Sequence, residues 1–234
     1  MDDLVERDGL HYKKFSDVPF TGEVEGREQG KFKNGKRDGP WVLYHDNGQL
    51  WSKGVYKNGK HEGPWVGYHE NGQLAGKVEF KNGKEEGSWV EYFDNGQLLS
   101  KGVYKNGKHE GPWVTYHDNG QLAWKGEYKN GKKDGPWVTY HDNGQSYEKT
   151  EYKNGIGDGL FLSHHDNGQL SEKGEYKNNK MDGPYVRYYK DGQLRKKGAY
   201  KNGKRVGRWV YYDTAGNLNS DRSGVYKDGV KISD

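Results

Sequence analysis

The sequence contains no cysteine, which excludes disulfide bonds and thiolate chemistry. No apolar run approaches the roughly 18 residues that a membrane-spanning helix needs, and the opening Met-Asp-Asp is unlike a signal peptide. We therefore expect no transmembrane segment. The compartment is left open: the protein would be cytoplasmic if the chain is complete, and exported if a leader has been removed.

Apolar side chains are also scarce. Only 30% of the residues are hydrophobic, 31% are charged, and the mean hydropathy is −1.29. These values alone are typical of disordered chains. However, aromatic residues make up 14% of the sequence and glycine accounts for 37 residues, and both recur at regular intervals. The regularity predicts an ordered fold with a thin core of aromatic rings.

The net charge of +4 is small, because 38 basic residues face 34 acidic ones. Such a weak excess is not the signature of a nucleic-acid-binding protein. We expect no specific nucleic-acid partner.

The sequence is a tandem repeat. A segment that begins Gly-Pro-Trp-Val and ends Tyr-Lys-Asn-Gly-Lys recurs every 24 residues without insertion or loss; its copies open at Gly39, Gly63, Gly87, Gly111, Gly135, Gly159, Gly183 and Gly207. A strict period of this length indicates one supersecondary unit copied and stacked. We assign residues 26–212 to the repeat array, residues 1–25 to an N-terminal cap and residues 213–234 to a C-terminal cap.

Each repeat contains two Asn-Gly turns, as at Asn58-Gly59 and Asn71-Gly72. Asn-Gly favours a two-residue type I′ hairpin loop. The segments between the turns are rich in residues that favour strands. The pattern predicts an all-β fold: an elongated, twisted antiparallel meander of about eight hairpin repeats with terminal caps.

Two-residue loops at these turns set a register. Gly54 would face Gly63, Ser52 would face Trp65, Leu50 would face Gly67, and His69 would face Leu74. Side chains alternate between the faces of a strand, so one face should carry the large aromatic rings beside strand glycines. The probable core is the aromatic column Trp41, Trp65, Trp89, Trp113, Trp137, Phe161, Tyr185 and Trp209.

The motif Tyr104-Lys105-Asn106-Gly107-Lys108-x-x-Gly111-Pro112-Trp113 resembles the MORN repeat, in the bacterial variant found in YwqK-family antitoxin proteins. The resemblance covers about residues 26–212. It implies serial β-hairpins and a role in protein binding or scaffolding, with an antitoxin function among the relatives. No toxin-contacting residue belongs to the motif, so none is transferred to this chain.

Catalytic and metal sites are not indicated. Histidines recur beside acidic residues at His45, His69, His117, His141 and His165, but a meander should space neighbouring copies roughly 9.6 Å apart. Zinc ligands must all lie about 2.0–2.3 Å from the metal. We therefore expect no metal, no cofactor, no catalytic residues and no enzymatic activity.

One turn edge should be positive, since it carries Lys57, Lys60, Lys81, Lys84, Lys105 and Lys108. This edge could bind polyanions, acidic lipid headgroups or glycans. It could equally serve solubility and prevent pairing between sheets. A structural or surface scaffold that binds such ligands is therefore the alternative to a protein-interaction module.

Trp51 and Trp124 lie outside the aromatic column and recur in no other repeat. They are candidates for exposed contact with a partner. If both serve binding, their replacement by Ala should leave stability nearly unchanged, whereas a loss of several kcal/mol would place them in the core.

Overall fold

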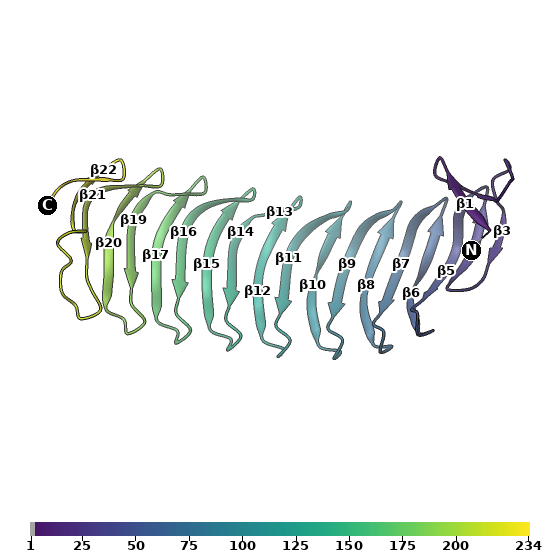
Figure 1. The fold of residues 1–234 in the computed structure, drawn as a ribbon, viewed down its shortest axis with the longest axis horizontal. Helices are drawn as coiled ribbons and strands as arrows, with labels where there is room; N and C mark the ends of the chain where they lie inside the picture. The colour runs from purple at the N-terminus through teal and green to yellow at the C-terminus, as the bar shows by residue number, and fades with distance from the viewer. Residues whose placement is uncertain (1–2) are drawn as a thin grey trace. The chain divides into compact units, whose positions relative to one another are not determined.

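The structure is a computed structural model that describes residues 3–234, and these residues contain strands but no helix. The chain forms two compact units, Met1–Glu110 and Gly111–Asp234. Each unit is a run of antiparallel strands that follow one another in chain order (Figure 1). The predicted all-β antiparallel meander is confirmed.

In the first unit, the strands that lie before the boundary are β1 (Leu4–Arg7), β2 (Leu10–Lys13), β3 (Gly22–Val24), β4 (Glu28–Lys33), β5 (Lys36–Tyr44), β6 (Leu50–Lys57), β7 (Lys60–Tyr68), β8 (Leu74–Lys81), β9 (Lys84–Tyr92) and β10 (Leu98–Lys105). Strands β1 and β2 form their own two-stranded sheet. From β3 to β10, each strand pairs with the next.

Strand β11 (Lys108–Tyr116) crosses the boundary between the units. The second unit continues with β12 (Leu122–Lys129), β13 (Lys132–Lys133), β14 (Gly135–Tyr140), β15 (Ser146–Lys153), β16 (Ile156–His164), β17 (Leu170–Lys177), β18 (Lys180–Met181), β19 (Gly183–Tyr188), β20 (Leu194–Lys201), β21 (Lys204–Tyr211), β22 (Gly224–Lys227) and β23 (Val230–Ser233). Pairing is again sequential; β12 pairs with both β13 and β14, and β17 pairs with both β18 and β19.

The two Asn-Gly turns of a repeat differ. Asn58 and Gly59 both have positive φ, 52° and 80°, as a type I′ turn requires. At the other turn only the glycine does, with φ of 83° at Gly72. Its loop spans His69–Gln73, closed by the bonds from Gly72 N to His69 O and from His69 N to Gln73 O, both 2.8 Å. The prediction of a two-residue loop there is wrong, and Tyr68 rather than His69 pairs with Leu74.

The predicted register across β6 and β7 is confirmed next to the Asn58-Gly59 turn, where Tyr56 pairs with His61, but from Gly54 to the far end of the hairpin it is wrong by two residues. Between the pairs Lys53–Val66 and Val55–Glu62, three residues of β7 oppose Gly54 alone. Gly63 has a left-handed φ of 66°, and Pro64 has no N–H to donate to the ladder, so the chain bulges there. Ser52 therefore pairs with Gly67 instead of Trp65. Because the shift is even, the predicted faces of the sheet survive.

The bulge seats a tryptophan over the glycine of the preceding strand at Trp41, Trp65, Trp137 and Trp209. A Cβ added to Gly54 would overlap the Trp65 ring, and the same holds for Gly198 with Trp209. The indole N–H of Trp65 donates to Val55 O at 3.1 Å, and equivalent 3.1 Å bonds are made by Trp137 and Trp209. The strand glycines thus let these three rings lie over the backbone, where their indole N–H groups are satisfied, whereas the buried Nε1 of Trp41 has no partner among residues 3–234.

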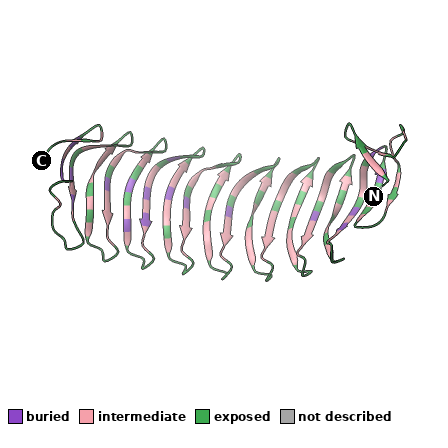
Figure 2. Ribbon diagram, in the orientation of Figure 1, coloured by how far each residue is buried: buried purple, intermediate pink, exposed green. Residues whose placement is uncertain are grey.

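How deeply each ring of the aromatic column is buried depends on the residue that faces it on the preceding strand, where most repeats have glycine. The buried members of the aromatic column are Trp41, Trp65, Trp113, Trp137, Phe161, Tyr185 and Trp209, all at most 8% exposed. Trp89 is only half-buried, because its cross-strand neighbour is Val78 instead of glycine. Where Thr150 takes the glycine position, the smaller Phe161 replaces tryptophan. Buried residues accordingly fall within the strands in Figure 2.

The two ends of the chain pack on the outermost repeats. Near the N-terminus, Gly35 N donates to Phe20 O at 2.7 Å, and the fully buried Phe32 contacts the rings of Phe20 and His11. Near the C-terminus, the buried Tyr226 contacts Trp209. The assignment of residues 1–25 and 213–234 as caps stays a prediction.

We predict that Gly54→Ala lowers the free energy of unfolding by about 1–3 kcal/mol, because the new methyl group displaces the Trp65 ring. Gly67→Ala is the matched control, since its Cβ would meet only Trp51 O, at 3.9 Å, and it should be neutral or stabilising by up to about 1 kcal/mol. Urea denaturation of both variants checks this. Equal midpoints would contradict the proposed contact.

Candidate interaction surface

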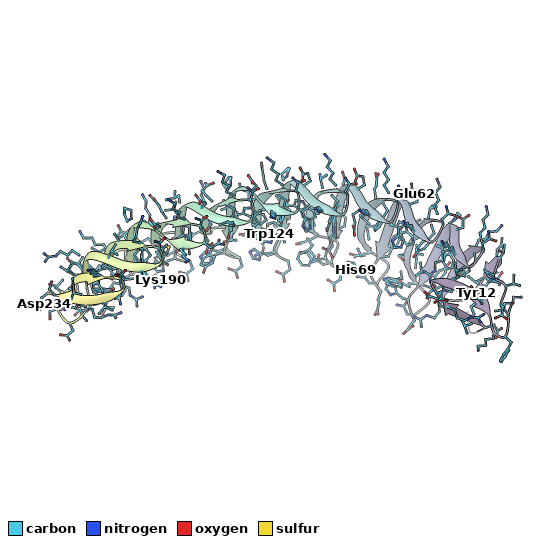
Figure 3. All side chains as sticks on the ribbon, turned by 90° about the horizontal axis from the view of Figure 1, so that it is seen from above. Tyr12, Glu62, His69, Trp124, Lys190 and Asp234 are labelled. Carbon is cyan, nitrogen blue, oxygen red and sulfur yellow. The ribbon has the colours of Figure 1, made fainter. Side chains whose placement is uncertain are left out.

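One face of the sheet carries the tryptophans, and we call it the ring face. The ring face carries the aromatic column and the strand-end rings of Tyr56 and Phe80. We call the other face of the sheet the opposite face. In Figure 3, Glu62 and His69 point to different sides of the sheet. Next to the aromatic column, on the ring face, every strand contributes one further residue.

These residues pair directly across neighbouring strands, and we call them the variable row. In the first unit the row is Glu28, Leu43, Ser52, Gly67, Gly76, Glu91 and Ser100. In the second it is Thr115, Trp124, Thr139, Glu148, Ser163, Glu172, Arg187, Lys196 and Tyr211. All are buried or half-buried.

The row varies between repeats, as do the positions of Trp51 and His61, whereas the opposite face behind it does not. The residues next to the row in sequence lie on the opposite face, where a valine on one strand pairs with a lysine on the next almost without change. The lysines are Lys53, Lys77, Lys101, Lys125, Lys149, Lys173 and Lys197. The aromatic column is likewise constant in type. A constant framework that displays variable side chains along one line has the form of a recognition surface.

In the first unit the variable row crosses a groove of about 620 Å³. Gly67 and Gly76 pair across the strands and form its floor, while Trp51, Trp65 and Trp89 are among its lining residues. The Arg37 guanidinium lies in the same groove, 2.7 Å from the Glu28 carboxylate and 4.5 Å from the centre of the Trp41 ring. The groove is mainly apolar, with charged groups at fixed points.

Burial shifts the pKa of two titratable side chains that line this groove. Burial lowers the pKa of His61, and the nearby Arg37 charge lowers it further, against the opposing effect of Glu85. The ring of His61 packs 4.3 Å from Trp65, and its Nε2 lies 2.8 Å from Tyr56 Oη. Burial raises the pKa of Glu91. Both shifts favour the neutral form of the side chain.

In the second unit the row is polar and charged. Thr150 donates to Glu148 at 2.9 Å, and Tyr185 donates to Glu172. Arg187 and Lys196 then follow on adjacent strands. The row thus changes from acidic to basic within the unit.

The structure places the two tryptophans proposed for contact in different environments. Trp51 is 52% exposed and occupies the bulge opposite Tyr44, so it borders the groove from outside the ladder. Trp124 belongs to the variable row; it is half-buried and stacks on Trp137 with ring centres 4.9 Å apart.

The proposed contact lysines Lys57, Lys60, Lys81, Lys84, Lys105 and Lys108 are all exposed. The acidic residues nearby serve the fold: Glu62 accepts from Asn82 N at 2.8 Å, and Glu86 accepts from Asn106 N at 2.8 Å. Each such bond fastens one turn to the next repeat. The charge of the lysine edge is therefore partly balanced by carboxylates held in place.

The recurring histidines fasten the other edge. Nε2 of His45 donates to Tyr68 O at 2.9 Å, and His69 donates to Tyr92 O at the same distance. His117, His141 and His165 bond the next repeat in the same way. Within residues 3–234, no group of three or more His, Asp or Glu side chains is arranged to hold a metal ion. The same residues include no helix long and apolar enough to cross a membrane.

Comparison with known protein families decides the relationship. The model of the MORN repeat variant matches residues 37–58, 62–82, 85–106, 110–130, 133–154, 157–178 and 181–202. This chain belongs to the MORN repeat variant family. The matched MORN repeats cover more than half of the sequence and contain every residue of the aromatic column except Trp209.

No curated protein matches the chain. Among solved structures it is similar to the crystal structure of TcdB2-TccC3-Cdc42, at 13% identity and a TM-score of 0.21, over 82% of this chain and 13% of that one. It is also similar to the Photorhabdus luminescens Tc holotoxin pore with the TccC3-D651A mutation, at 14% identity and a TM-score of 0.19, over 79% of this chain and 13% of that one. Scores this low carry no argument about function.

The variable row was not identified from the sequence alone. Its signal is present, because aligning the repeats at 24 residues shows that the row positions change between copies, together with the positions of Trp51 and His61. The incorrect register hid it by pairing Ser52 with Trp65, so that successive row residues did not fall beside one another.

We predict that His61 makes stability depend on pH. Its pKa is lowered in the folded protein, so the unfolded chain takes up a proton first, and stability is lost as the pH falls below the unfolded value of 6.5. His61→Phe keeps a ring in place and should lose less stability between pH 8 and pH 5. Urea midpoints at both pH values test this; parallel losses in the two proteins would contradict it.

We further predict that the two tryptophans differ in their effect on stability. Trp51→Ala should change the free energy of unfolding by less than about 0.5 kcal/mol, as expected for an exposed side chain. Trp124→Ala should cost about 1–2 kcal/mol, because it removes the stacked pair with Trp137. Urea denaturation of the two variants separates them, and equal costs would show that one of the placements is wrong.

Proposed function

We propose that this chain is a non-enzymatic protein-interaction module that binds its partner through the variable row on the ring face. The observation that supports this is the contrast between positions. The aromatic column, the turns and the valine–lysine alternation repeat almost unchanged, whereas the paired row residues range from glycine to tryptophan, glutamate and arginine.

The groove of the first unit supports the same proposal. Its volume of about 620 Å³ falls in the range of sites that hold compact ligands or side chains. Aromatic side chains dominate the energetics of protein interfaces, and three tryptophans line this groove. In YwqK-family relatives the corresponding function is that of an antitoxin, so a toxin is the class of protein partner that we propose.

A second candidate function is a scaffold that binds polyanions, acidic lipids or glycans. The observation that favours it is the exposure of the six proposed contact lysines. Two pairs of them face each other across hairpins, Lys57 with Lys60 and Lys81 with Lys84. Binding through this edge would weaken steeply with salt and would not depend on the ring face.

The two candidates are separated by capture from a lysate of the source organism with paired variants. Glu91→Lys with Glu148→Lys reverses two charges on the variable row. Glu79→Lys with Glu127→Lys makes the same change in the same units on the opposite face, where both side chains are exposed and pair with prolines.

We expect a partner that is retained by the wild-type chain and by the opposite-face variant but lost from the row variant. The partner is then identified by mass spectrometry. Equal retention by both variants, or retention that only high salt abolishes, would contradict the proposed surface and favour the lysine edge.

A further inference from the structure

Arg187 and Lys196 place two positive charges side by side in the variable row of the second unit. They are directly paired across β19 and β20. Like charges directly opposite each other destabilise a sheet. The fold gives these side chains little access to water to relieve the repulsion, because both are half-buried.

Neither charge has an ion-pair partner among the residues that the structure describes. Among residues 3–234, Arg187 makes no ion pair or side-chain hydrogen bond, and its Nε is buried without a partner. A buried donor left unpaired costs about 1–3 kcal/mol. The Lys196 ammonium contacts only ring faces, 4.9 Å from the centre of Tyr185 and 6.0 Å from that of Trp209.

The pKa of Lys196 reflects this imbalance. Burial lowers the pKa of Lys196, and the charge of Arg187 lowers it further, against the opposing effect of Glu172. Glu172, the nearest acidic residue of the row, instead accepts a hydrogen bond from Tyr185. The site therefore lacks an anion that could satisfy both cations together.

We propose that Arg187 and Lys196 form an anion site that receives a carboxylate side chain of the protein partner. This inference rests on the proposed function, since it assigns chemistry to one part of the variable row. A carboxylate can accept hydrogen bonds from a guanidinium and an ammonium at once. The Tyr185 and Trp209 rings supply an apolar platform for the methylene groups of an acidic side chain.

The nearby Glu172 favours a carboxylate over a phosphate group. Glu172 lies opposite Arg187 on the other neighbouring strand, so one negative charge already stands at the site, although Arg195 and Arg205 add positive charge near Lys196. Glu172 would repel a singly charged carboxylate less than a phosphate group, whose charge is about −1.5 to −2.

The site is tested with the full chain and a capped hexaglutamate peptide, by titration calorimetry at low ionic strength. Arg187→Gln with Lys196→Gln should weaken peptide binding at least about tenfold, the effect of losing charged hydrogen bonds. Lys153→Gln with Lys204→Gln is the control; it removes the same charge from two exposed turn lysines of the same unit, and binding should remain within about twofold.

Three outcomes would overturn the proposal. The first is absence of peptide binding to the wild-type chain, and the second is an equal loss in both variants. The third is that the site variant loses binding of inorganic phosphate or phosphatidylserine vesicles and keeps binding of the peptide, which would make the site one for phosphate groups.

Stability gives an independent readout. Arg187→Gln alone should raise the urea midpoint at low ionic strength, because it relieves the repulsion with Lys196; a lower midpoint would mean that Arg187 is a structural partner and would overturn the proposal.

The captured partner distinguishes failure of the anion site from failure of the proposed interaction surface. Loss of that partner from the Glu91→Lys/Glu148→Lys variant but not from the Arg187→Gln/Lys196→Gln variant would leave the interaction surface in place and reject this site.

Discussion

The contact between an indole ring and the glycine of the preceding strand, made by Trp41, Trp65, Trp137 and Trp209, constrains the rest of the structure. A chain with 30% hydrophobic residues cannot build a deep core, so it buries large rings flat against backbone. This requires a glycine where the ring lies, and a bulge where the ring-bearing strand enters. The consequences are visible where the rule is relaxed: Val78 leaves Trp89 half-buried, and Thr150 is matched with the smaller Phe161.

Stacking of repeats is completed at the turns. On one edge, carboxylates such as Glu62 accept from the backbone of the next hairpin turn; on the other, histidines such as His45 donate to the last carbonyl of a strand in the next repeat. These bonds use the charged and polar residues that made the composition resemble a disordered chain. With both edges and the aromatic column committed to the framework, the variable row is one of the few places where repeats can differ, and it is where we place the interaction surface and the anion site.

The sequence alone predicted the strands, their antiparallel order and the aromatic column, because a 24-residue period with Asn-Gly turns leaves few alternatives. It failed where backbone geometry overrides pattern. Asn71-Gly72 has the same letters as Asn58-Gly59, yet only the latter is type I′. Gly63-Pro64 cannot continue a regular ladder, and the resulting bulge moves Ser52 from Trp65 to Gly67. The row that carries the proposed function depends on that register, and the unpaired Arg187 could not be identified until its cross-strand neighbours were known.

The seating of the rings can be measured directly from the proton chemical shifts of the strand glycines. An indole lying flat over a glycine shields its Hα protons through the ring current. We expect the Hα resonances of Gly54, beneath Trp65, to be shifted strongly upfield, while those of Gly67, on the same face with no ring above it, remain near ordinary strand values. Equal shifts at the two glycines would contradict the contact on which the fold, the register and the variable row all depend.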